Sequence, residues 1–338
     1  MRGQTLSEPK QTSMSIHELA VPIASHLKSV EKEIEKIIFS EKGFIQDLTQ
    51  YMISYKGKRI RPALLLLTGH ETGGVNEKHI EASAIVELIH TATLVHDDVM
   101  DGALTRRHRQ SVNTKWTNHT AVMLGDFIYC SAFESLSQWQ DTTAYQKLTK
   151  ITRQMCEGEI LQLHNKHYTN LKESDYNQII KDKTASLFAI SSWFGGYVND
   201  LDKIECQKLY QFGESLGMAF QIVDDLIDII GNEKTHGKSL GTDLKEGKMT
   251  LPLIRLLKIV PHHQRGEIID KIESSSFSVQ SKIIREILLD SGATQQTIDS
   301  AKDYCSQAIA ALDDMSHSMS KLYHIPDIIL QEIEPYQF

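Results

Sequence analysis

Apolar residues recur every three or four positions along most of the chain, which is the spacing of one helical face. From Ile16 to about Ser40 this spacing is kept by Leu19, Ile23, Leu27, Val30, Ile34 and Ile37. The same pattern predicts helices over residues 43–55, 62–72, 79–100, 120–138, 143–167, 175–198 and 206–231, and three or more helices after residue 250. Sustained period-two alternation flanked by hairpin dipeptides is missing from the sequence. The pattern predicts an all-α fold, a single-domain helical bundle.

Proline and glycine mark where predicted helices begin and end. Pro62 falls in the first turn of its helix, where a missing N–H is tolerated, and Gly73-Gly74 ends that helix. Residues 105–113 are polar, and residues 231–247 contain four glycines, so both segments are predicted to be loops.

Composition narrows the classes of function. The net charge of −8 and a pI near 6.0 argue against nucleic acid as the main partner. The four cysteines are scattered without a C-x-x-C pair, which favours reduced thiols in a cytoplasmic protein. No run of about 18 apolar residues is present, so no transmembrane segment is expected. Residues 1–14 are polar and aperiodic and are expected to form a flexible tail, with one domain over residues 15–338.

Two acidic motifs of identical spacing follow apolar stretches. Residues 97–101 read DDVMD and residues 224–228 read DDLID. In each motif the first and last aspartates are four residues apart, on one helix face. A single copy is usually a solvated helix end, whereas two copies where helices leave the core would repel strongly without cations. The pair therefore predicts two facing motifs that hold magnesium on a diphosphate, because magnesium prefers carboxylate and phosphate oxygens.

Basic residues beside both motifs agree with an anionic substrate. A lone lysine or arginine is usually only surface charge, but here the following lie near the acidic motifs: Lys58, Arg61, Arg106, Arg107, Lys183, Lys238 and Lys248. Arginine's planar fork matches phosphate oxygens, and lysine supplies a mobile charge. His90 lies two helical turns before Asp97 on the same face. At that distance along the helix it could bind a second anionic substrate.

These motifs, in this order, resemble the trans-prenyltransferase family, the all-α polyprenyl diphosphate synthases. The matching segments are GKRIRP at 57–62, His90 ahead of DDVMD at 97–101, Arg106-Arg107, GD at 125–126, KT at 183–184, FQIVDDLID at 220–228, GK at 237–238, GTD at 241–243 and GKMTLP at 247–252. The resemblance runs from about residue 20 to 320. It implies a helical bundle of the isoprenoid synthase type with a central cavity, which acts as a homodimer.

The resemblance also implies two diphosphate sites. About three magnesium ions would bridge an allylic diphosphate (dimethylallyl, geranyl or farnesyl) to Asp97, Asp101 and Asp224. The residues implied around this diphosphate are also Asp98, Arg106, Lys183, Thr184, Gln221, Asp225, Asp228 and Lys238. Isopentenyl diphosphate would bind Lys58, Arg61, His90 and Arg107. Two positions depart from the family's usual pattern: His108 replaces a glycine, and the C-terminus lacks the basic tail of some short-chain members.

The helix with the first motif is also expected to line a tunnel for the growing chain. At 1.5 Å per residue, Thr93 lies about 6 Å and Ile89 about 12 Å below Asp97. Ala92 and Thr93 are small, so they leave the tunnel open. We therefore predict a long-chain product of roughly seven to nine isoprene units, about C35 to C45. The tunnel floor is expected to be a bulky residue on a neighbouring helix, such as Phe127 or Phe133.

Four other interpretations are weighed against this one. A medium-chain synthase would make geranylgeranyl or farnesyl diphosphate. A class I terpene cyclase would not need the second diphosphate site. A di-iron bundle needs two helical Glu-x-x-His motifs, and only Glu87-x-x-His90 lies on a predicted helix. A non-catalytic partner subunit would be expected to have lost aspartates, whereas both motifs here are complete.

Overall fold

The structure is a computed structural model, and it describes residues 16–55, 57–107, 109–231, 241–273 and 277–336. The first half contains α1 (Ile16–Ala20), the 3₁₀ turn η1 (Val21–Ile23), α2 (Ala24–Ile37), α3 (Gly43–Ile53), α4 (Ile60–Glu71), α5 (Glu77–Met100), β1 (Thr105–Arg106), β2 (Arg109–Gln110), α6 (Val112–Lys115), α7 (Asn118–Ser137) and α8 (Thr142–His164).

The second half contains α9 (Glu173–Ile180), a π turn (Lys181–Ala185), α10 (Ser186–Tyr197), α11 (Lys203–Ile230), α13 (Thr242–Lys245), α14 (Leu251–Ile259), α15 (His262–Glu273), α16 (Phe277–Asp290), α17 (Ala293–Ala311), η3 (Leu322–His324), α18 (Ile325–Gln331) and η4 (Glu334–Tyr336). The described residues thus confirm the predicted all-α class.

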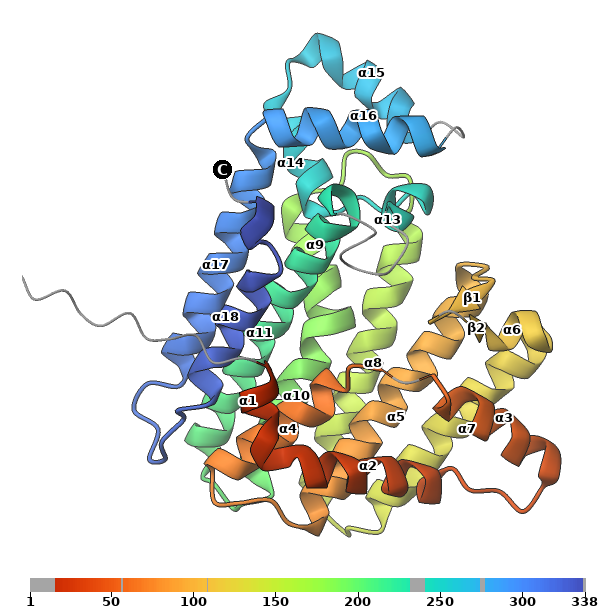
Figure 1. The fold of residues 1–338 in the computed structure, drawn as a ribbon, viewed down its shortest axis with the longest axis vertical. Helices are drawn as coiled ribbons and strands as arrows, with labels where there is room; N and C mark the ends of the chain where they lie inside the picture. The colour runs from red at the N-terminus through yellow and green to blue at the C-terminus, as the bar shows by residue number, and fades with distance from the viewer. Residues whose placement is uncertain (1–15, 56, 108, 232–240, 274–276, 337–338) are drawn as a thin grey trace, which may run out of the picture.

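The long helices α5, α7, α8, α10 and α11 form a bundle, with α17 against α11 and with α15 and α16 across one end (Figure 1). Large side chains fill its centre, including Ile89 on α5, Phe188 on α10 and Phe212 on α11, all fully buried. Burying a side chain of this size stabilises the fold by about 1.5–3 kcal/mol. The core thereby fixes the two helices that end in the acidic motifs.

Local caps set where these two helices begin. The Asn76 side chain accepts hydrogen bonds from the backbone N–H groups of Lys78 and His79, and the His79 ring reciprocates to form a capping box at the start of α5. Asp202 accepts from the N–H groups of Ile204 and Glu205 at the start of α11. Each helix then runs without interruption to its acidic motif.

Four sequence predictions need correction. The loop predicted over residues 231–247 contains the one-turn helix α13, which is too short to show helical periodicity. The single helix predicted for residues 16–40 is broken at Pro22, which lies in η1, because proline has no N–H to donate. The loop predicted over residues 105–113 contains the antiparallel pair β1–β2 and the start of α6; each strand has two residues, too few to give an alternating pattern. The helix predicted over residues 175–198 is interrupted by the π turn Lys181–Ala185.

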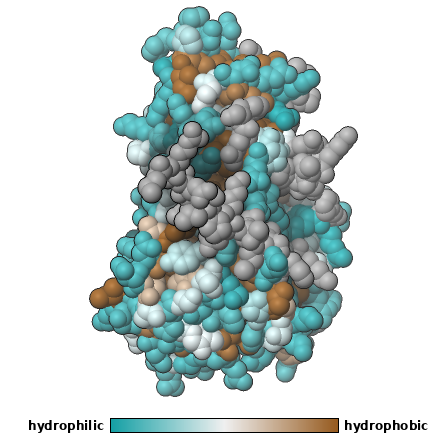
Figure 2. Space-filling view, turned by 60° about the vertical axis from the view of Figure 1, so that its left-hand side comes forward, coloured by the Kyte–Doolittle hydropathy of each residue, from teal (hydrophilic) through white to brown (hydrophobic). Residues whose placement is uncertain are grey.

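Figure 2 shows one face of the molecule, which is mostly hydrophilic, with hydrophobic residues gathered near its top and others scattered below. Among the described residues, none of the helices is both long and apolar enough to cross a membrane, in line with the sequence prediction.

Candidate functional site

The first acidic motif lies at the end of α5, where lysines from three other segments converge on it. Lys183 Nζ is 3.9 Å from Asp97 Oδ2. Lys166 Nζ is 3.1 Å from Asp101 Oδ1, and Lys248 Nζ is 3.7 Å from Asp101 Oδ2. Burial raises the pKa of Asp97 to about 6, although the positive charge of Lys183 acts in the opposite direction. Positive charge near this motif therefore stabilises the ionised form of Asp97.

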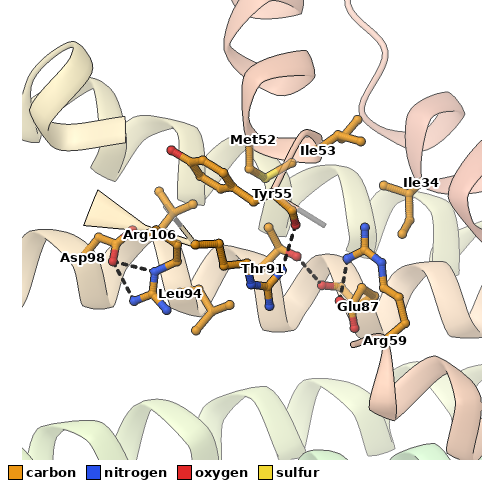
Figure 3. Close-up of a pocket in the computed structure, with 12 residues that line it drawn as sticks. Ile34, Met52, Ile53, Tyr55, Arg59, Glu87, Thr91, Leu94, Asp98 and Arg106 are labelled. Carbon is orange, nitrogen blue, oxygen red and sulfur yellow. Dashed lines mark hydrogen bonds and ion pairs between the residues drawn. The ribbon is translucent and has the colours of Figure 1, made fainter. Parts of the chain in front are cut away.

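The middle aspartate of this motif has a different environment. Asp98 is buried and accepts hydrogen bonds from Arg106, at 2.7 Å from Nε and 2.6 Å from Nη2 (Figure 3). Burial raises the pKa of Asp98, and the Arg106 guanidinium opposes that shift. Asp98 therefore holds Arg106, and with it strand β1, close to the end of α5.

The second acidic motif is bound to the segments around it. Asp225 is buried and accepts hydrogen bonds from the Tyr176 hydroxyl (2.7 Å) and the Gln221 amide (2.6 Å). Asp228 accepts from the Thr242 hydroxyl and from the backbone N–H of Asp243, both at 3.0 Å. These bonds tie α11 to α9 and α13.

Lys248 links the surroundings of the two motifs. Its Nζ lies 3.7 Å from Asp101 and 3.7 Å from Asp243, and 2.5 Å from Glu246. Burial, together with the charge of Asp228, raises the pKa of Asp243 to about 7. Lys248 therefore brings the end of α5 close to the segment after α11.

Within the described residues, no group of three or more histidine, cysteine or acidic side chains is close enough to hold a metal alone. The donors that the motifs offer are carboxylate oxygens, which suit magnesium, and magnesium usually completes its shell with waters and substrate phosphates. The donor set thus fits a metal shared with a phosphate-bearing ligand, and it does not fit an all-protein cage.

A hollow of about 600 Å³, open to solvent, lies between the π turn, α11 and the segment after α13, and its lining includes Lys183, Thr184, Gln221, Asp243 and Lys248. The Thr184 hydroxyl donates to Gln221 Oε1 at 2.8 Å. Lys183 also forms an ion pair with Glu159. Charged and polar side chains from the π turn, α11, α13 and the segment after α13 thus line one opening.

The π turn that carries Lys183 and Thr184 depends on close packing. Gly158 on α8 faces this turn, and a Cβ there would lie 2.7 Å from the backbone nitrogen of Lys183. π turns widen a helix and occur often at functional sites. The helical periodicity does not indicate the turn. Gly217 on α11 also packs closely on it, since a Cβ there would lie 2.6 Å from the Ala185 Cα.

Arg61 and Arg107, two of the residues predicted for isopentenyl diphosphate, lie near a third, His90 on α5. The Arg61 guanidinium lies 4.9 Å from the centre of the Phe188 ring, and its buried Nε has no hydrogen-bond partner among the described residues. Burial lowers the pKa of Arg61 to about 10. Burial also lowers the pKa of His90, as do Arg61 and Arg107 nearby, so His90 is neutral near pH 7. Lys58 is exposed.

The hairpin with Arg106 and Arg107 is anchored to the end of α3. Arg107 Nη1 donates to the Tyr55 carbonyl at 2.7 Å. The hydroxyls of Tyr51 and Tyr55 both donate to the Gln110 carbonyl, at 2.9 and 2.5 Å. These bonds were not predicted from the sequence, because the partners are more than 50 residues apart.

The predicted tunnel residues occupy the core side of α5. Ala92 and Ile89 are fully buried, whereas Thr93 is half-buried and donates its hydroxyl to the His90 carbonyl at 2.7 Å. Phe127 and Phe133 are half-buried on α7, which packs along α5. Lys238 and His108, both named from the sequence, lie outside the described residues.

Comparison with known proteins places the chain in a family. Residues 42–289 match the model of the polyprenyl synthetase family. An all-trans-nonaprenyl-diphosphate synthase (geranyl-diphosphate specific) of Rhodobacter capsulatus is 33% identical over 89% of this chain and 92% of that protein. A geranylgeranyl diphosphate synthase of Saccharolobus solfataricus is 30% identical over 89% and 93%.

A solved structure agrees with the sequence relatives. The polyprenyl synthase of Caulobacter crescentus, complexed with calcium and isoprenyl diphosphate, is 32% identical, covers 95% of this chain and 98% of its own, and superposes with a TM-score of 0.87. Fold, motifs and relatives agree: the chain belongs to the polyprenyl synthetase family and is a prenyltransferase.

Proposed function

We propose that this chain condenses isopentenyl diphosphate with an allylic diphosphate in repeated 1′–4 steps, giving a polyprenyl diphosphate of about C35 to C45. The observation that carries the proposal is the double arrangement around α5. At its end the first acidic motif lies against three lysines, of which Lys248 also reaches Asp243 in the segment after the second motif. A separate cluster forms where Arg61 and Arg107 lie near His90. A terpene cyclase, with one diphosphate to bind, would have no use for that second cluster.

We assign the allylic diphosphate to the acidic side. Asp97, Asp101 and Asp224 would hold magnesium, about three ions, whose charge stabilises the departing diphosphate when they are bound. Lys183 lies close enough to Asp97 to reach the same diphosphate. Arg106, held by Asp98, would add a fixed positive charge. Lys238 is included here on the family motif alone.

The charged groups lower the barrier because they are in place before the reaction begins. When the allylic C–O bond breaks, its electron pair leaves with the diphosphate, and preorganised cations stabilise that charge. The oxygens of Thr184 and Gln221, already joined by a hydrogen bond, would face the allylic cation, and Phe220 would offer a ring face. The protein supplies no nucleophile.

Isopentenyl diphosphate would occupy the other cluster, bound by Lys58, Arg61 and Arg107, with neutral His90 as a hydrogen-bonding partner. Its double bond attacks the allylic carbon and forms the new C–C bond. The adduct then loses one proton to the released diphosphate and so regains a double bond. Arg61 supports this assignment because its buried Nε lacks a protein partner among the described residues.

The long product is supported by two observations. Ala92 and Thr93 put small side chains just below the first motif, and long-chain synthases are among the relatives. The geranylgeranyl relative keeps a medium-chain product as the second candidate. We also propose that the chain works as a homodimer in the cytoplasm, as the family resemblance implies.

The direct test is a product assay. Purified protein is incubated with magnesium, labelled isopentenyl diphosphate and dimethylallyl, geranyl or farnesyl diphosphate in turn; the products are dephosphorylated and analysed by mass spectrometry. We expect linear alcohols of about C35 to C45. A C15 or C20 end product would overturn the chain length. Cyclic hydrocarbons with no incorporation of isopentenyl diphosphate would overturn the proposed reaction.

A further inference from the structure

A partly buried ion triad joins α2, α5 and the start of α4 beside the isopentenyl diphosphate cluster; its Glu31 side chain is 41% exposed. Arg59 donates from Nε and Nη2 to the two carboxylate oxygens of Glu31 on α2, at 2.6 and 3.0 Å. Its Nη1 donates to Glu87 on α5 at 2.6 Å (Figure 3). The side chain of Arg59 is 14% exposed and that of Glu87 is 5% exposed.

The backbone of Arg59 has an uncommon conformation. Its φ of 51° and ψ of 38° lie in the left-handed region, which costs energy for a residue with a Cβ. Arg59 also precedes the first residue of α4, and its carbonyl accepts from the N–H of Ala63 at 2.9 Å. A conformation of this kind persists only where the surroundings fix it. The two-pronged bond to Glu31 and the bond to Glu87 do so here.

This turn sets the direction of two residues that we assign to isopentenyl diphosphate. Lys58 comes directly before the left-handed residue, and Arg61 comes two residues after it, in the first turn of α4. Relaxing Arg59 towards ordinary backbone angles would redirect Lys58 relative to Arg61. The spacing between the two cations therefore depends on the side-chain anchors of Arg59.

The charges of the triad matter as well as its geometry. Burial lowers the pKa of both Arg61 and Arg107, and the negative charge of Glu87 opposes that shift in each, so Glu87 lies close to both. A buried carboxylate without a partner is costly. If Arg59 were removed, Glu87 would draw on Arg61 and Arg107, the cations that a diphosphate needs. Arg59 satisfies Glu87 and leaves these two arginines for the substrate.

We propose that Arg59 is a positioning residue of the isopentenyl diphosphate site, a role that rests on the function proposed above. It touches no substrate. It fixes the turn between Lys58 and Arg61, and it neutralises Glu87.

The test compares Arg59→Met, Arg59→Met/Glu87→Gln and Arg59→Lys in the full-length chain. For Arg59→Met we expect KM for isopentenyl diphosphate to rise about tenfold or more, while KM for the allylic substrate changes by less than about twofold. In the double variant most of the loss should be recovered, because no unpaired carboxylate remains. Arg59→Lys keeps the charge without the fork and should fall between wild type and Arg59→Met.

Arg153→Met is the matched control, because it removes an arginine from an exposed ion pair with Glu157, in which the two side chains are 79% and 48% exposed. Equal increases in both KM values, or no recovery in the double variant, would overturn the positioning role. If Arg59→Met does not fold, Arg59→Lys is judged by the same ratio of KM values. A wild-type chain that fails to incorporate isopentenyl diphosphate would instead refute the proposed function.

Discussion

Replacing Gly158 by alanine tests whether close packing of α8 holds the π turn. The added Cβ would lie 2.7 Å from the backbone nitrogen of Lys183 and 3.0 Å from Asp182 Cβ. Backbone atoms cannot rotate away as a side-chain end can. We expect the turn to move by at least about 0.7 Å to regain ordinary contact, because the interior is close-packed.

The magnitude follows from two opposing effects. Overpacking of this kind costs about 1–3 kcal/mol, and the better helix propensity of alanine returns up to about 1 kcal/mol. A net loss of about 1–2 kcal/mol should lower Tm by about 1–3 °C in a chain of 338 residues. Because Lys183 moves with the turn, kcat for elongation should fall about tenfold to a hundredfold.

The assay measures Tm and kcat with both substrates saturating, alongside Gly266→Ala. Gly266 lies within α15, and a Cβ there would meet nothing within 4 Å. The control should therefore gain up to about 1 kcal/mol and keep its kcat. If Gly158→Ala melts no earlier than wild type and keeps its kcat within about twofold, the close approach is not what positions Lys183.

Three shorter predictions follow from the same site. Ala92→Phe should shorten the product, measured by chromatography of the dephosphorylated alcohols; an unchanged length would contradict the tunnel. Asp97→Ala, in the chain expressed alone, should lower kcat by at least about a hundredfold, whereas full turnover would show that the first motif is dispensable. Without magnesium, Tm should fall as the pH rises from about 4 to 7.5. Burial raises the folded-state pKa of Asp97 to about 6 and that of Asp243 to about 7, so over this range the folded state holds protons that the unfolded state has lost. Added magnesium should reverse that slope, and equal slopes with magnesium and with a chelator would refute the electrostatic argument.

The two long helices that carry the acidic motifs could be predicted from the sequence, because local interactions determine them. The periodicity over residues 79–100 predicts α5, which runs from Glu77 to Met100, and that over residues 206–231 predicts α11, which runs from Lys203 to Ile230. Both helices are long and have local caps, so their ends are specified by neighbouring residues. The acidic motifs could be placed at helix ends for the same reason.

Features held by distant partners could not be predicted in this way. The hairpin strands have two residues each and depend on Tyr51 and Tyr55, which precede them by more than 50 residues. The left-handed turn at Arg59 depends on Glu31 and Glu87, each 28 residues away. Lys166 next to Asp101 was missed for the same reason, since it reaches the motif from the end of α8, 65 residues later. In each case a single sequence shows the residue but not its partner.

The partners of the aspartates give a reason why two motifs of the same spacing need not supply the same number of metal ligands. In the first motif, the middle residue Asp98 is committed to Arg106, while Asp97 and Asp101 face lysines that magnesium and diphosphate can displace. In the second motif, Asp225 accepts one hydrogen bond from Tyr176 on α9 and one from Gln221 on its own helix, and Asp228 accepts two from α13, so taking either as a ligand would disrupt contacts with α9 or α13. The two motifs therefore differ in their middle and last residues: Asp101 faces lysines, whereas Asp225 and Asp228 hold the packing around α11.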